Sequence, residues 1–169
     1  MSIVLTHAYY LFEDEKEQKI MKPYPPLGLL YVSAYLNQNG IENNVYDSTF
    51  YSFDEQLTFI EEKQPKVISI YTNLMTKLNV IKLIHVLTSN EKYGSPKIVL
   101  GGPDITYNVE NYLQLNVDFL VIGEGEETMS ELYNAIVDKQ PYNKIQGIAY
   151  QEDGQIIKTP PRIKIKDVS

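Results

Sequence analysis

The sequence predicts a doubly wound α/β domain with a parallel five-stranded sheet, and three observations support this. Short runs rich in Val and Ile alternate with longer amphipathic segments, as strands alternate with helices in this class. Two of the apolar runs lead directly into glycine-containing turns, Gly101-Gly102-Pro103 and Gly123-Glu124-Gly125-Glu126. The length of 169 residues, 43% of them apolar, suffices for one domain with a real core.

Five short apolar runs are the expected strands of the sheet. They cover residues 2–6, 41–47, 67–71, 97–100 and 118–122. The second run alternates only weakly and is typical of an edge strand, whereas the others resemble buried central strands. A ligand of such a sheet binds outside the carboxyl ends of the strands, so residues that follow strands are the first candidates for a site.

A helix is expected after each of the five strands. The first has a broad apolar face and should be well buried: Leu27, Leu30, Tyr31, Ala34 and Tyr35. Ser52 and Glu55 form a capping box at the start of the second helix. The core stripe of the third helix is predicted to include Leu74, Leu78, Ile81 and Leu87. Residues 13–22 are polar without an apolar period, which predicts a surface loop, and a loop of this length inside a compact domain is often functional.

The order of these elements predicts the domain organisation. Residues 1–145 form the α/β domain, and a flavodoxin-like strand order, 2-1-3-4-5, is expected. Residues 146–160 are expected to form a C-terminal β-hairpin of the same domain, because a Gly-containing turn separates two short apolar runs. Residues 161–169 begin with Pro161 and are expected to be a linker.

Composition and charge exclude several classes of function. The chain has no cysteine, so it cannot itself hold an iron–sulfur cluster or a Cys-zinc site. The net charge of −7 disfavours nucleic acid and anionic membranes as partners. No apolar run reaches the length of a membrane span, and the N-terminus lacks a signal-peptide pattern. We therefore expect a cytoplasmic domain.

Four segments carry a resemblance to a known family: YPPLGLLYVSAYLNQNGIENNVYD (24–47), VLGGPDIT (99–106), VDFLVIGEGEET (117–128) and GIAYQEDGQIIKTPPR (147–162). In this order and spacing the chain resembles the cobalamin-binding domain that precedes the catalytic barrel in cobalamin-dependent radical S-adenosylmethionine proteins. That family includes methyltransferases and relatives of the anaerobic magnesium-protoporphyrin monomethyl ester oxidative cyclase.

The resemblance implies that the ligand is cobalamin, with its nucleotide tail between the sheet and the helices. It implies no catalytic residue and no protein metal ligand in this chain. The implied cofactor-binding residues lie at the carboxyl ends of predicted strands or directly after them: Thr6, His7, Tyr71, Thr72, Gly101, Gly102, Pro103, Asp104, Gly123, Glu124, Gly125 and Glu126. At Gly101 and Gly102 the backbone is expected to approach the buried tail too closely for a Cβ. Tyr71 lies where the family commonly has a serine, and its ring could narrow the channel for the tail.

The chain departs from the D-x-H-x-x-G motif, whose histidine binds cobalt in methionine-synthase-type domains. His7 follows the first strand, but Leu5 and Tyr10 occupy the positions of the Asp and the Gly. The carboxylate that orients the imidazole is thus missing at its usual position. His7 could close the strand as a structural residue, contact the corrin or bind the cobalt, and the first of these is favoured.

The C-x-x-x-C-x-x-C motif of the family's radical barrel is also absent from this chain. The resemblance therefore implies a cobalamin-binding module, joined through residues 161–169 to a C-terminal barrel of the same protein that holds the [4Fe–4S] cluster and S-adenosylmethionine. The parent protein would carry out methyl transfer or oxidative cyclase-type chemistry. The alternative is a degenerate module that keeps the fold as a docking domain without corrin. A signalling receiver is disfavoured, since residues 6–8 contain no acidic cluster.

Overall fold

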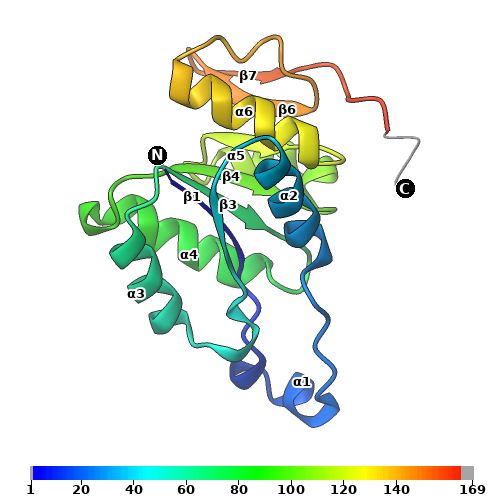
Figure 1. Ribbon diagram of the computed structural model, residues 1–169. Coiled ribbons are helices and arrows are strands. Elements are labelled where there is room, and N and C mark those ends of the chain that lie inside the picture. Colours follow the sequence, from blue (N-terminus) through cyan, green and yellow to red (C-terminus); the bar gives the residue numbers. More distant parts are fainter. Residues whose placement is uncertain (1, 165–169) are drawn as a thin grey trace.

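One seven-stranded sheet forms the centre of the computed structural model, which describes residues 2–164 (Figure 1). The strands lie in the order β2-β1-β3-β4-β5-β6-β7. Their bounds are β1 Ile3–His7, β2 Asn43–Tyr46, β3 Val67–Tyr71, β4 Lys97–Gly101, β5 Phe119–Val121, β6 Ile148–Glu152 and β7 Gln155–Lys158. The first five strands are parallel, which confirms the predicted order 2-1-3-4-5 and the edge position of β2.

The predicted number of five strands is wrong for the sheet as a whole, because the C-terminal hairpin joins it. Strand β6 pairs antiparallel with β5, and β7 pairs antiparallel with β6. Residues Ile148, Ala149 and Tyr150 are buried and lie opposite 119–121. The hairpin thereby covers the edge that β5 would otherwise expose to solvent.

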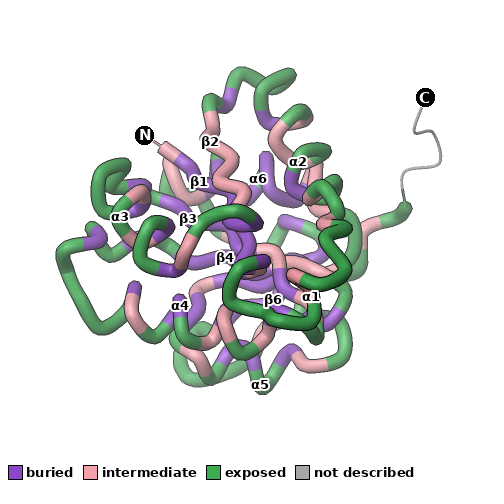
Figure 2. The backbone as a smooth tube through the Cα atoms, turned by 90° about the horizontal axis from the view of Figure 1, so that it is seen from below, coloured by how far each residue is buried: buried purple, intermediate pink, exposed green. Residues whose placement is uncertain are grey.

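Helices cover both faces of the sheet. Their bounds are α1 Glu15–Ile20, α2 Leu27–Gln38, α3 Phe53–Lys63, α4 Lys77–Ser89, α5 Val109–Leu113 and α6 Glu126–Asp138. Side chains of α3, α4 and α5 pack against one face, and side chains of α2 and α6 pack against the other. Figure 2 shows the buried positions concentrated on the strands between these layers. No helix within residues 2–164 is long and apolar enough to cross a membrane.

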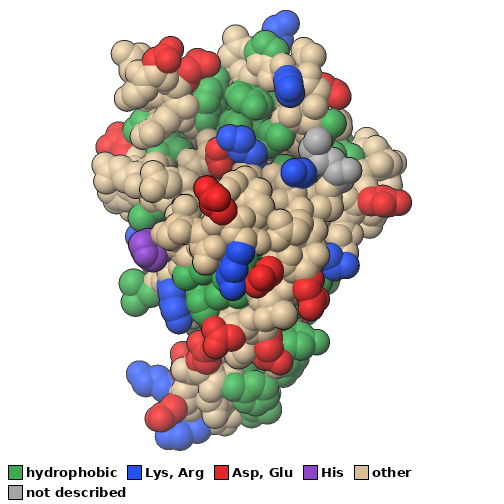
Figure 3. Space-filling view, turned by 90° about the vertical axis from the view of Figure 1, so that its left-hand side faces the viewer, with side chains coloured by type: hydrophobic (Ala, Val, Ile, Leu, Met, Phe, Trp, Pro, Cys, Tyr) green, Lys and Arg blue, Asp and Glu red, His purple; other side chains and the backbone are tan. Residues whose placement is uncertain are grey.

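The segment 13–22, expected as a loop, contains the short helix α1, so that expectation is wrong. The signals that form this helix are local rather than periodic. The Asp14 side chain accepts hydrogen bonds from the amides of Lys16 and Glu17, and Glu15 lies in the first turn. No residue of α1 is buried. In Figure 3 this lowest part of the molecule shows charges of both signs beside hydrophobic side chains.

The predicted apolar faces of α2 and of the third helix are partly exposed. Leu27, Leu30 and Tyr31 of α2 lie on the outside, while Leu29 and Leu36 reach the core. Nearly all positions in the first half of α2 are apolar, so the pattern does not single out one face.

The third helix is α4, and it departs from the prediction in a similar way. Leu74 precedes the helix and is exposed, as is Leu78 near its start, whereas Leu87 is buried as predicted.

Candidate functional site

A cavity of about 290 Å³ opens at the carboxyl edge of the sheet, between α2 and the start of α6. Its floor is formed by the ends of β3, β4 and β5, and its lining is largely backbone and apolar side chains. The lining residues are Gly28, Leu29, Val32, Ser69, Ile70, Tyr71, Gly101, Gly102, Pro103, Thr106, Val121, Gly123, Glu124, Gly125, Glu126 and Met129. We call it the glycine-lined cavity.

At three of its glycines an added Cβ would not clash with any protein atom. A Cβ at Gly101 would meet only Val121, at 3.9 Å, and a Cβ at Gly28 would meet only Tyr71, at 3.8 Å. At Gly125 the nearest atom would be 3.5 Å away, on Val32. These are ordinary van der Waals distances, so the fold does not require glycine there. Side chains at these positions would instead fill the cavity.

Gly102 is needed for a reason other than the expected one. It was predicted to permit the close approach of a ligand, but a neighbouring segment of backbone occupies the space. Its φ is +125°, and a Cβ would lie 2.0 Å from the carbonyl oxygen of Thr72. The Thr72 amide also donates to the carbonyl of Gly101, which fixes this close approach of the backbones. Gly102 is therefore required by the turn itself, whether or not a ligand is present.

A second cavity of about 430 Å³ lies over the end of β1. We call it the upper cavity, where upper means beyond the carboxyl end of β1; this end of the strand points downward in Figure 1. It is lined by His7, Tyr9, Glu17, Lys22, Pro23, Tyr24, Pro25, Pro26, Leu27, Gly28, Leu29, Thr49, Tyr71, Asn73, Met75 and Thr76. Tyr71, Gly28 and Leu29 line both cavities. Residues 22–26, which precede α2, line the upper cavity, and α2 itself lines both cavities.

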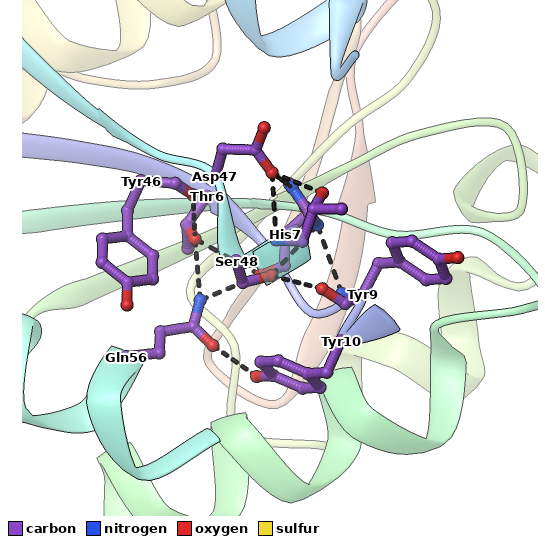
Figure 4. A network of polar contacts seen from close by, with 9 residues as sticks. Thr6, His7, Tyr9, Tyr10, Tyr46, Asp47, Ser48 and Gln56 are labelled. Atoms are coloured by element: carbon purple, nitrogen blue, oxygen red, sulfur yellow. Dashed lines mark hydrogen bonds and ion pairs between the residues drawn. The ribbon is translucent and has the colours of Figure 1, made fainter. Parts of the chain in front are cut away.

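His7 is held on both ring nitrogens (Figure 4). Its Nε2 donates to Oδ1 of Asp47 at 2.8 Å, and its Nδ1 accepts from the amide of Tyr9 at 3.2 Å. The Asp47 carboxylate comes from the residue after β2, so a neighbouring strand supplies the partner that the sequence motif lacks. Because one ring nitrogen donates and the other accepts, this arrangement leaves no lone pair for a metal. Both ring nitrogens of His7 are thus engaged by groups of the protein itself.

Burial and hydrogen bonding set the charges of this pair. Burial lowers the pKa of His7 below 6.5 and outweighs the hydrogen bond and the negative charge of Asp47, which raise it. Burial raises the pKa of Asp47, but hydrogen bonds from Thr49 and His7 outweigh it and hold that pKa below 3.8. The imidazole is therefore neutral and Asp47 is ionised at pH 7.

The structure brings most of the predicted site residues together. Eight of them line the glycine-lined cavity: Tyr71, Gly101, Gly102, Pro103, Gly123, Glu124, Gly125 and Glu126. His7 lines the upper cavity. Thr6, Thr72 and Asp104 line neither cavity.

The side chains of these three residues are engaged elsewhere or buried. The hydroxyl of Thr6 donates a hydrogen bond to the carbonyl of Tyr46. It also accepts one from the side-chain amide of Gln56, which lies on the opposite face of the sheet. Thr72 is buried. Asp104 accepts hydrogen bonds from Tyr112 and Asn108.

Sequence reasoning missed the contribution of α2 to the site. Gly28 lines both cavities, and Leu29 and Val32 line the glycine-lined one. Gly28 could have been found, because glycine is unfavourable inside a helix and needs a reason to be there. The others read as ordinary core residues of an amphipathic helix. Within residues 2–164 no group of three or more His, Cys, Asp or Glu is placed to hold a metal ion.

Two curated proteins are similar in sequence to most of this chain. The anaerobic magnesium-protoporphyrin IX monomethyl ester cyclase of Synechocystis sp. is 32% identical over 148 residues, which cover 85% of this chain and 30% of the cyclase. An uncharacterized methyltransferase of Pyrococcus horikoshii is 27% identical over 151 residues, covering 85% of this chain and 32% of that protein. The chain thus spans about a third of the length of these curated relatives.

Two solved structures share the fold. The cobalamin-dependent S-adenosylmethionine radical enzyme OxsB, solved with aqua-cobalamin, superposes with a TM-score of 0.82 at 16% identity, over 96% of this chain and 22% of OxsB. The radical S-adenosylmethionine methyltransferase TsrM from Kitasatospora setae, solved with cobalamin and a [4Fe–4S] cluster, gives a TM-score of 0.73 at 17% identity, over 99% of this chain and 30% of TsrM. Residues 18–133 match the family described as B12 binding domain, and the chain therefore belongs to that family.

Proposed function

We propose that this chain is the cobalamin-binding module of a radical S-adenosylmethionine protein. The observation that carries the proposal is the glycine-lined cavity at the carboxyl edge of the sheet. Gly28, Gly101 and Gly125 keep it open although the protein has room for a side chain at each. A fold that had lost its ligand would have no reason to keep these positions empty, so the degenerate module is not favoured.

The residues present fit a corrinoid with a nucleotide tail. The glycine-lined cavity, with backbone walls, suits the flat base of the tail, which needs a narrow apolar slot. The upper cavity, with Tyr9, Tyr24 and three prolines in its lining, suits the edge of a large flat macrocycle. When bound, cobalamin supplies a cobalt centre for methyl transfer or related radical chemistry. This chain positions it and contributes no catalytic residue.

We further propose that the parent protein holds a [4Fe–4S] cluster and S-adenosylmethionine in a barrel outside this chain. The names of the relatives support methyl transfer or oxidative cyclase-type chemistry for the parent. Cysteine ligands for a cluster are absent from this chain, so such a cluster would need ligands from elsewhere.

A cavity-filling series at Gly101 tests cobalamin binding. Gly101→Ala and Gly101→Val place one and three carbons in the cavity. The position has an ordinary strand conformation, so the free energy of unfolding should stay within about 1 kcal/mol of wild type. Binding of hydroxocobalamin should weaken progressively, by about tenfold or more for Gly101→Val, as in overpacked sites. Equilibrium dialysis with detection at visible wavelengths measures the Kd.

The matched control is Ala34→Leu, which adds the same three carbons at an exposed position of α2 outside the cavity. It should bind hydroxocobalamin as the wild type does. If the wild-type protein retains no corrinoid, or if Gly101→Val and Ala34→Leu bind equally well, the proposed site is wrong.

A further inference from the structure

Three residues form a row across the carboxyl edge of the sheet. His7 of β1 is in register with Tyr71 of β3, and Tyr71 is in register with Gly101 of β4. Residues in register on neighbouring parallel strands project from the same face of a sheet. This is the face that α2 and α6 cover, because Leu5 and Val99, two residues before His7 and Gly101, pack in the core on that side.

The row places an aromatic ring between two open spaces. The upper cavity lies at the His7 end of the row, and the glycine-lined cavity lies at the Gly101 end. Tyr71 stands between them and lines both. On its other side the ring reaches the start of α2: a Cβ at Gly28 would lie 3.8 Å from Cε2 and 3.9 Å from Cδ2 of Tyr71. The tyrosine ring thus closes the gap between sheet and helix.

The Tyr71 ring is held by packing and not by a hydrogen bond. Tyr71 is half-buried, and within residues 2–164 its hydroxyl forms no hydrogen bond. Gly28 carries no side chain, and a Cβ added there would meet no atom within 4 Å except two ring carbons of Tyr71. Since χ1 rotation of such a residue requires no loss of a polar partner, the ring can turn away when a ligand competes for the space.

We propose that Tyr71 is a gate that determines which corrinoids this domain accepts. This inference rests on the proposed function. An intact corrinoid carries a nucleotide tail, and a ligand that uses both cavities must pass the Tyr71 ring. A corrinoid without the tail needs only one of the two spaces and leaves the ring in place. Displacing the Tyr71 ring costs free energy, and this cost lowers the affinity of the domain for corrinoids that carry the intact tail.

The test compares hydroxocobalamin with diaquacobinamide, which lacks the nucleotide tail. Tyr71→Ser removes the ring and joins the two cavities. We expect its affinity for hydroxocobalamin to rise by about tenfold, because the ligand no longer has to displace a half-buried aromatic ring. The affinity for cobinamide should change little. Tyr71→Phe keeps the ring and loses only the hydroxyl, so it should behave as the wild type. Equilibrium dialysis gives each Kd, and thermal unfolding verifies the fold of each variant.

Gly28→Ala provides a second, opposite perturbation. Alanine is favoured over glycine in a helix, so the variant should be at least as stable as wild type. Its new Cβ would lie 3.8 Å from the Tyr71 ring and would also enter the cavity, so hydroxocobalamin should weaken more than cobinamide. The part of this loss that acts through the ring should disappear in the double variant Gly28→Ala/Tyr71→Ser, whereas the part that comes from filling the cavity should remain.

The outcomes separate this inference from the function on which it rests. A tail-dependent gain in Tyr71→Ser that is absent in Tyr71→Phe supports the gate. Equal changes for both corrinoids in Tyr71→Ser, or no change for either, overturn the gate while leaving cobalamin binding intact. Failure of every folded variant to bind either corrinoid overturns the proposed function, and the gate with it.

Discussion

The tautomer of His7 is fixed by a carboxylate that lies far away in the chain. The sequence motif that would orient the imidazole is missing, yet the carboxylate of Asp47 orients it from the neighbouring strand. That carboxylate holds the proton on Nε2 and leaves Nδ1 to accept from Tyr9. A sequence motif locates a partner only when it is close in the chain, and this partner lies 40 residues away.

The buried imidazole predicts a pH dependence of stability. The folded-state pKa of His7 lies below 6.5, so the unfolded chain binds the proton more readily. Its contribution to stability is complete above pH 6.5 and is lost as the pH falls below that value, by at most about 1.4 kcal/mol per pH unit. His7→Gln keeps a donor for Asp47 but does not titrate. Urea unfolding at pH 7.5 and 5.5 should show a smaller loss for His7→Gln than for the wild type.

The second histidine of the chain provides the control for this measurement. His85 is exposed on α4, and His85→Gln should show the same loss between the two pH values as the wild type. An equal loss for His7→Gln and wild type would contradict the assignment. Asp47 does not interfere, because its own pKa lies below 3.8, outside this window.

The adjacent glycines 101 and 102 show what a sequence alone cannot separate. Both were expected to permit the approach of a ligand. The structure assigns Gly102 to a backbone contact with Thr72 and leaves only Gly101 facing open space. The distinction depends on φ and on a residue of another strand, and neither can be read from the dipeptide.

At the scale of elements, the strands were predictable and the helix faces were not. The predicted runs 67–71 and 97–100 coincide with β3 and nearly with β4, because buried central strands are continuous apolar runs bounded by polar or Gly residues. Apolar periodicity in a helix predicts an apolar face, but it does not show whether another part of this chain covers that face. The apolar residues at the starts of α2 and α4 therefore looked like core, although in this chain they lie at the surface.

Two leucines predicted for the same stripe of α4 should respond very differently to truncation. Leu78 is 81% exposed and Leu87 is 2% exposed. Leu87→Ala should lower the free energy of unfolding by about 2–5 kcal/mol, because it leaves a cavity in the core. Leu78→Ala should change it by less than about 0.5 kcal/mol. Urea denaturation of the two variants provides the comparison, and similar losses would mean that α4 is oriented as the sequence stripe predicted.

At the scale of the whole molecule, the C-terminal segment is attached across the sheet edge to α6. Arg162, within the predicted linker, is largely buried and forms ion pairs with Glu127 and Glu131. Its Nε also donates to Thr128 at 2.8 Å. The carbonyl of Pro160 accepts from the amide of Gly147 at 2.9 Å. The rest of the predicted linker, 165–169, lies outside the described residues.

This attachment predicts that Arg162 holds the segment around residues 160–162 against α6. Arg162→Gln should loosen the segment, and the Gly147 amide reports this because it donates to Pro160. The two glutamates are 42% and 49% exposed, so solvent weakens the pairs, and we expect a loss of about 1 kcal/mol, or roughly a fivefold faster hydrogen exchange at Gly147. Lys97→Gln, which removes the exposed pair with Asp118, should leave that amide unchanged. Unaltered exchange in Arg162→Gln would show that the hairpin alone holds residues 160–162 in place.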